Sequence, residues 1–209
     1  MDDWPTFSLF VAASLALIIA PGPDLLYVLA RGIAQGRRAG LLSAAGVTLG
    51  ILVHTLLAAL GLAVLLQTSA LAFMLVKYVG AAYLVYLGVK AFRDKDGFAP
   101  QAHRQAASGR VIFWQGVLSN VLNPKVALFF LAFLPQFVHE NGVHPAVQMI
   151  GLGLLFAGMG VVFLCFLGYF AGSVGHWLQH RPAVAARMRW VTGGIFLLLG
   201  LRLAFLERR

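Results

Sequence analysis

The chain has 209 residues, of which 60% are hydrophobic and only 11% are charged, and its formal net charge is +9. A soluble domain carries roughly a quarter charged residues, so this chain lacks the polar surface that it would need in water. Its length fits one domain, and we expect that domain, residues 1–209, to lie in a lipid bilayer. The basic residues stand in short clusters between long apolar runs, which is typical of the ends of membrane helices and argues against a nucleic-acid partner.

Apolar runs predict six transmembrane helices that make up nearly all of the chain. A helix of about 20 mostly apolar residues crosses the ~30 Å hydrocarbon core of a bilayer. Backbone polar groups cannot remain unpaired in hydrocarbon, so runs of this length must be helical. The fold class is therefore an all-α membrane protein. The predicted spans cover residues 6–30, 41–66, 70–90, 111–135, 146–174 and 189–206.

The first predicted span is interrupted by Pro21-Gly22-Pro23, and Asp24 follows directly. Proline removes a backbone donor and clashes with the preceding turn, so this segment should open the helix and free backbone groups. Lipid cannot pair those groups, so a cavity or a neighbouring helix must do so. A simple packing kink is the alternative, because proline and glycine are common in membrane helices.

The second span carries Gly46, Gly50 and His54 at intervals of four residues, which places them on one stripe of a helix. Glycines in such a stripe permit a close approach of helices. His54 in mid-span is a candidate for relaying protons, and a histidine satisfied in the core is an equal alternative.

Residues 93–110 read as a linker that divides the chain into two groups of three helices, residues 1–92 and 111–209. The halves resemble each other weakly. Residues 77–90 of the third span and 189–202 of the sixth share cations, aromatic residues and glycine in step. Three spans is an odd number, so the second half should be inverted in the bilayer relative to the first.

The fourth span repeats the interruption of the first, because Asn123-Pro124-Lys125 lies about 100 residues after Pro23-Asp24. Asn120 lies one turn before Asn123 and could satisfy loosened backbone or bind a substrate. Interrupted helices at matched positions of inverted halves indicate the binding site of a secondary transporter.

Asp24 and Lys125 are the only acidic and basic residues deep within predicted spans. Each costs about 2.5–3.5 kcal/mol at the centre of a bilayer, and such residues usually mark a transport pathway. A structural ion pair between two helices is the alternative. The two charges need not touch. They suit a zwitterion whose ammonium binds Asp24 and whose carboxylate binds Lys125 together with a freed helix N-terminus.

The distribution of positive charge predicts the orientation of the spans. The first, third and fifth loops carry eleven basic residues, and the opposite side carries four. These three loops should therefore be cytoplasmic, and both termini should lie outside. The eleven are Arg31, Arg37, Arg38, Lys90, Arg93, Lys95, Arg104, Arg110, Arg181, Arg187 and Arg189.

Four segments together resemble the LysE/RhtB family of amino-acid exporters: residues 20–24, 46–54, 77–88 and 120–137. The resemblance covers essentially the whole chain in order, and the Pro-Gly-Pro and Asn-Pro-Lys segments are its specific part. It implies a six-span protein of the bacterial inner membrane that exports amino acids by exchange with protons, and it leans toward a homodimer. Because Asp24 is the only intramembrane acid, a neutral or homoserine/threonine-like substrate is favoured over a dication.

The sequence thus predicts a secondary-active amino-acid exporter that needs no cofactor. Its expected substrate-binding residues are Pro21, Gly22, Pro23, Asp24, Asn120, Asn123, Pro124 and Lys125, with Asp24 and His54 as candidates for proton coupling. No motif indicates an enzyme. A metal-ion exporter is one alternative, although one Asp, one His and one Cys on separate spans make a poor set of ligands. A membrane scaffold with a dry interior at the two breaks is the other.

Overall fold

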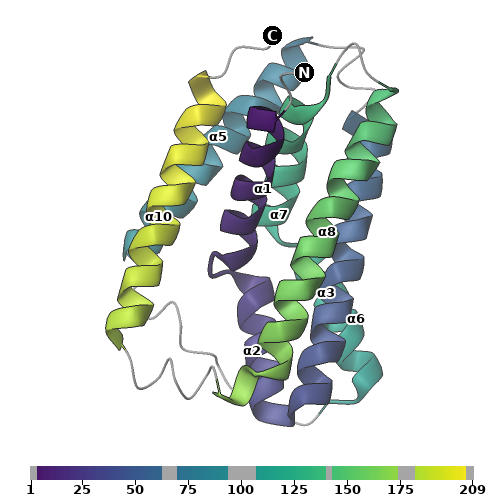
Figure 1. Ribbon diagram of the computed structural model, residues 1–209, viewed down its shortest axis with the longest axis vertical. Helices are drawn as coiled ribbons and strands as arrows, with labels where there is room; N and C mark the ends of the chain where they lie inside the picture. The colour runs from purple at the N-terminus through teal and green to yellow at the C-terminus, as the bar shows by residue number, and fades with distance from the viewer. Residues whose placement is uncertain (1–3, 63–69, 94–106, 140–142, 174–181, 206–209) are drawn as a thin grey trace.

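The computed structural model describes residues 4–62, 70–93, 107–139, 143–173 and 182–205. The prediction of an all-helical protein is confirmed, because the elements in these ranges are all helices. The helices form one elongated bundle, and α1 (Trp4–Ile19) begins at the same end at which α10 (Pro182–Phe205) finishes (Figure 1).

The two predicted interruptions are present as bends between helices. α1 is followed after a short break by α2 (Pro23–Gln35), at an angle of 48°. α6 (Gly109–Val121) is followed by α7 (Pro124–Leu128) and the short turns η2 (Phe129–Phe133) and η3 (Leu134–Phe137), at an angle of 45°. In both cases a proline is the first residue of the second helix. The first N–H groups of a helix have no acceptor within the helix, so the missing N–H of proline costs no hydrogen bond there.

The remaining helices are continuous. They are α3 (Arg37–Leu57), which ends in the π-helical turn η1 (Ala58–Leu62), α5 (Ala70–Arg93), α8 (Pro145–Tyr169) and α10. In the described ranges, α3 with η1 and α8 are each long and apolar enough to cross a membrane, and each bent pair adds one candidate if it is counted as one span. The described residues therefore contain between two and four candidate spans by this criterion.

The first predicted loop is wrong in its extent. α2 continues to Gln35, and only Gly36, with φ at 82°, separates it from α3. Arg31, which the charge pattern predicts in this loop, lies inside α2 and is buried. The helix continues past the apolar run because Tyr27 and Arg31 find partners on α6. Gly36 then ends the helix with a positive φ, which favours glycine. Residues 67–69, which separate the second and third predicted spans, and most of the linker at 93–110 lie outside the described residues.

The glycine stripe of α3 lies against α6, as the sequence predicts. A Cβ atom added to Gly46 would lie 2.1 Å from the carbonyl oxygen of Phe113, and one added to Gly50 would lie 2.6 Å from the Cβ of Asn120. α8 packs on the same helix through Gly153, which faces Thr55. These contacts hold α3 between α6 and α8 and leave no room for side chains.

We expect Gly46→Val to destabilise the protein, because its side chain would meet backbone that cannot move aside. Overpacking of this kind costs about 1–3 kcal/mol of the free energy of unfolding. Gly158→Val is the matched control, since Gly158 is an exposed mid-helix residue with open space at its Cβ position. Thermal unfolding in detergent checks the pair, and an equal loss in both variants would contradict the packing role of Gly46.

Candidate functional site

Asp24 lies in the first turn of α2, where the helix dipole favours a negative charge. Its carboxylate is buried against the end of α6. Oδ2 accepts hydrogen bonds from the amide nitrogens of Asn120 and Asn123, both at 2.8 Å, and Oδ1 accepts one from the hydroxyl of Ser119 at 3.3 Å. The structure thus brings together Asp24 and both predicted asparagines, which come from the two broken helices.

Lys125 lies in the corresponding first turn of α7 and is also buried. Its ammonium donates hydrogen bonds to the carbonyl oxygens of Leu17 and Ala20, at 2.9 and 3.0 Å. These carbonyls are at the end of α1, where the break leaves them without helical partners. The free backbone groups that the sequence predicts at the first break are therefore bound by the charge from the second break.

The N-cap residues of α2 and α7 lie next to the charged side chains of the site. Gly22 is the N-cap of α2 in extended conformation, and a Cβ atom there would lie 3.0 Å from Lys125 Nζ. Asn123 is the N-cap of α7, and its side-chain oxygen accepts a hydrogen bond from the backbone N–H of Lys125 at 3.0 Å. Each broken helix thus restarts directly beside the charged side chain of the other.

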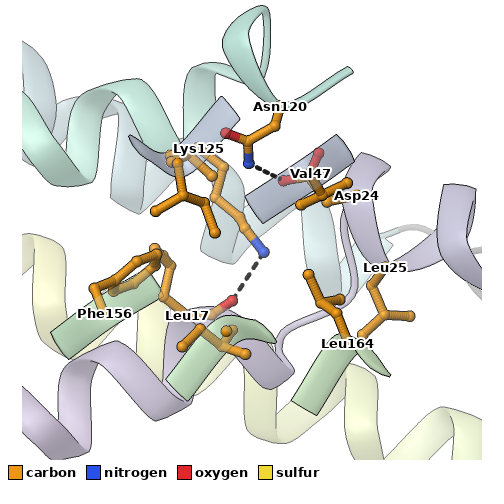
Figure 2. Close-up of a pocket in the computed structure, with 12 residues that line it drawn as sticks. Leu17, Asp24, Leu25, Val47, Asn120, Lys125, Phe156 and Leu164 are labelled. Carbon is orange, nitrogen blue, oxygen red and sulfur yellow. Dashed lines mark hydrogen bonds between the residues drawn. The ribbon is translucent and has the colours of Figure 1, made fainter. Parts of the chain in front are cut away.

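Asp24 and Lys125 line one small cavity of about 30 Å³, shown in Figure 2. In the part of the chain that the structure describes, their hydrogen bonds go to other groups and not to each other. A cavity of this volume holds about one or two water molecules, so an amino acid needs the surrounding helices to move apart. The apolar part of its lining is Leu17, Ile18, Leu25, Val47, Ile51, Val126, Phe156 and Leu164.

His54 lies next to this site. Its Nε2 is 3.1 Å from the carbonyl oxygen of Asn120, near the end of α6, and its ring lies against Phe130 with 5.9 Å between ring centroids. The backbone carbonyl at the break is thus one partner of the imidazole. The role of His54 in proton coupling stays a prediction.

Several residues of the site were not predicted from sequence. Ser119 could have been found, because it precedes Asn120 at the break. The aliphatic lining residues could not, since they resemble any other apolar residue of a membrane helix. Within the described ranges, no three His, Cys, Asp or Glu residues lie close enough together to hold a metal ion.

Two proline-broken helices that present opposite charges to one cavity are an arrangement expected in a membrane transporter. The chain belongs to the LysE type translocator family, whose model matches residues 15–207. This confirms the resemblance seen in the sequence. It makes the protein a member of a family of multi-pass bacterial membrane transporters, and the family is not one of enzymes.

Three relatives show how far the likeness extends. An uncharacterized membrane protein of Bacillus subtilis is 34% identical over 82% of this chain and 85% of its own length. Another, of Pseudomonas aeruginosa, is 33% identical over 95% of this chain and 94% of its own. A protein of Klebsiella pneumoniae named leucine efflux protein is 31% identical over 95% of this chain and 94% of its own. No solved structure matches the chain.

Proposed function

We propose that this protein exports a neutral aliphatic amino acid from the bacterial cytoplasm, with its binding site between the α1–α2 and α6–α7 breaks. The observation that carries the proposal is the pair of opposite charges, Asp24 and Lys125, on the wall of one cavity. An amino-acid zwitterion offers the complementary pair. Its ammonium would replace the asparagine donors at Asp24, and its carboxylate would compete with the backbone carbonyls for Lys125.

The apolar wall of the cavity supports a leucine-like side chain. Apart from Asp24, Lys125 and Asn120, most of the side chains that line it are aliphatic. A hydroxyl-bearing substrate such as threonine would leave its hydroxyl without a partner there, which is unfavourable in an apolar site. The relatives named leucine efflux protein, from Klebsiella and Salmonella, agree with this preference over homoserine or threonine. A dication would need a second acid, and Asp24 is alone on this wall.

We further propose six spans in two inverted halves. α5 and α10 have 24 residues each, about 36 Å at 1.5 Å per residue, which is enough for one crossing apiece. Their contact supports an inverted pairing. A Cβ at Gly88 would lie 2.9 Å from the carbonyl oxygen of Gly193, and a Cβ at Gly200 would lie 2.9 Å from that of Ala81. In the sequence repeat, which aligns residues 77–90 with 189–202, residue 81 corresponds to residue 193 and residue 88 to residue 200. The two contacts therefore join the same two pairs of equivalent positions, exchanged between the helices.

The same proposal places the α2–α3 end of the bundle in the cytoplasm and both termini outside. Arg37 and Arg38 begin α3 at that end (Figure 1), and Arg110 lies in the first turn of α6, whose Gly109 lies against Leu42 of α3. Basic residues at one end favour the cytoplasmic side. Export against a gradient would be driven by protons that are exchanged at Asp24. His54 would shift the end of α6 through its contact with the carbonyl oxygen of Asn120. A homodimer is compatible with the large exposed apolar surface.

An export assay tests this function. Cells that lack their own leucine exporters and overexpress the protein are loaded with alanyl-leucine, alanyl-threonine or alanyl-lysine, and the released amino acids are measured outside. We expect rapid release of leucine, weaker release of threonine and none of lysine. Release of lysine alone, or equal release with and without the protein, would contradict the proposal. The cellular content of divalent metals, measured in parallel, tests the metal-exporter alternative.

A further inference from the structure

A second polar network joins α2 to α6, between the cavity and the end of the bundle where α2 meets α3 (Figure 1). The hydroxyl of Tyr27 donates a hydrogen bond to the carbonyl oxygen of Ile112 at 2.7 Å. Nη2 of Arg31 donates one to Oε1 of Gln115, also at 2.7 Å. Asp24, Tyr27 and Arg31 are spaced by three and four residues, so they share one face of α2. A polar seam therefore runs along α2 and α6 from the cavity toward the end of the bundle.

Arg31 is the unusual member of this seam, because its guanidinium is buried and its partners among the described residues are all neutral. Its side chain is 3% exposed. Nη1 donates to Oε1 of Gln35 at 2.7 Å, the ring of Tyr27 lies 5.8 Å away, and the buried Nε has no hydrogen-bond partner. Taking a cation out of water costs several kcal/mol, which an anionic partner offsets better than neutral amides do.

No acidic side chain of the described residues is available as that partner. Asp24 is the only Asp or Glu in those ranges, and it lies seven residues before Arg31, about 10 Å along the helix. Its two oxygens already accept hydrogen bonds from side chains at the end of α6. The guanidinium thus has an open nitrogen, two exchangeable amide partners and the planar geometry that binds a carboxylate through two parallel hydrogen bonds.

We propose that Arg31 binds the carboxylate of the amino acid as it enters from the cytoplasm, before the substrate reaches Asp24 and Lys125. Gln115 occupies the guanidinium in the closed conformation, and the entering carboxylate replaces it when α2 and α6 separate. This inference rests on the proposed function. It adds an entry site about two helical turns from the cavity and makes the seam between α2 and α6 the cytoplasmic path.

Inside-out membrane vesicles test the inference, because their cytoplasmic face is exposed to added radiolabelled leucine. We expect Arg31→Gln to raise the apparent KM at that face by about tenfold or more, as the loss of a charge-assisted hydrogen bond implies, with little change in Vmax. Gln115→Leu is the matched variant, since it removes the same contact between α2 and α6 but keeps the cation. It should not raise the apparent KM.

If Arg31 merely clamps α2 to α6, Arg31→Gln and Gln115→Leu will change transport alike, and that result would overturn the inference. Gln115→Glu provides a test that retains Arg31 even if Arg31→Gln fails to fold. It supplies a resident carboxylate that competes with the substrate, so the apparent KM should rise, and an unchanged KM would also count against the entry site. Absence of leucine transport by the wild-type protein would overturn the proposed function itself, whereas transport with a normal KM in Arg31→Gln would overturn the entry site alone.

Discussion

Asp24→Asn should reduce leucine transport by about 10- to 100-fold while the protein still inserts and folds. The substitution keeps the shape of the side chain and one oxygen for the asparagine donors. It removes the negative charge that would bind the substrate ammonium, and a hydrogen bond to a charged group contributes about 1.5–3 kcal/mol. Initial rates in proteoliposomes, normalised to the amount of inserted protein, measure this effect.

Ser119→Ala is the control for Asp24→Asn. It removes the longest hydrogen bond to the carboxylate, at 3.3 Å, and leaves the charge in place. Transport should stay close to that of the wild type. Normal transport by Asp24→Asn would remove Asp24 from the mechanism, and an equal loss in both variants would indicate that hydrogen bonding at the break, rather than charge, sustains activity.

Lys125→Met should show two effects with different readouts. The apparent KM for leucine should rise by about tenfold or more, because the substrate carboxylate loses its cation. The free energy of unfolding should fall by about 1–3 kcal/mol, because the carbonyls of Leu17 and Ala20 lose their donor in a buried site. Methionine keeps an apolar stem of similar length, so the cavity should not collapse for steric reasons.

Lys90→Met serves as the control, since Lys90 is an exposed cation near the end of α5. It should change neither the KM nor the stability. A fall in stability of Lys125→Met without any change in KM would reduce Lys125 to a cap for the end of α1. The structural role would then stand, and the carboxylate-binding role would not.

The sequence predicted the two breaks because proline acts through its own ring and missing N–H, which need no knowledge of the neighbours. It also singled out Asp24 and Lys125, because charges deep within an apolar run usually mark a transport pathway. The partners themselves depend on how the helices pack. That Lys125 binds the carbonyl oxygens of Leu17 and Ala20, more than 100 residues earlier, follows from tertiary structure alone.

Helix boundaries were less predictable than the breaks. A charge at the end of an apolar run usually marks the membrane surface, so the sequence predicts Arg31 in a loop. In the structure Arg31 is helical and buried, because Gln115 of α6, a helix far away in the sequence, accepts a hydrogen bond from it. The position of Gly36 was the available signal, because glycine commonly stops a helix. The cavity lining had no such signal, as aliphatic residues look alike whether they face a substrate, a neighbouring helix or lipid.

Competition for binding of radiolabelled leucine to the purified protein tests the central claim most directly. The competitors are unlabelled leucine, 3-methylbutylamine, which lacks the carboxylate, and 4-methylpentanoate, which lacks the ammonium. If Asp24 binds the ammonium and Lys125 binds the carboxylate, a ligand needs both charges to bind tightly. Leucine should then compete at least about tenfold better than either analogue. Competition by both analogues as strong as that by leucine would show that the cavity recognises only the aliphatic chain, and the account of the two broken helices as a zwitterion site would fail.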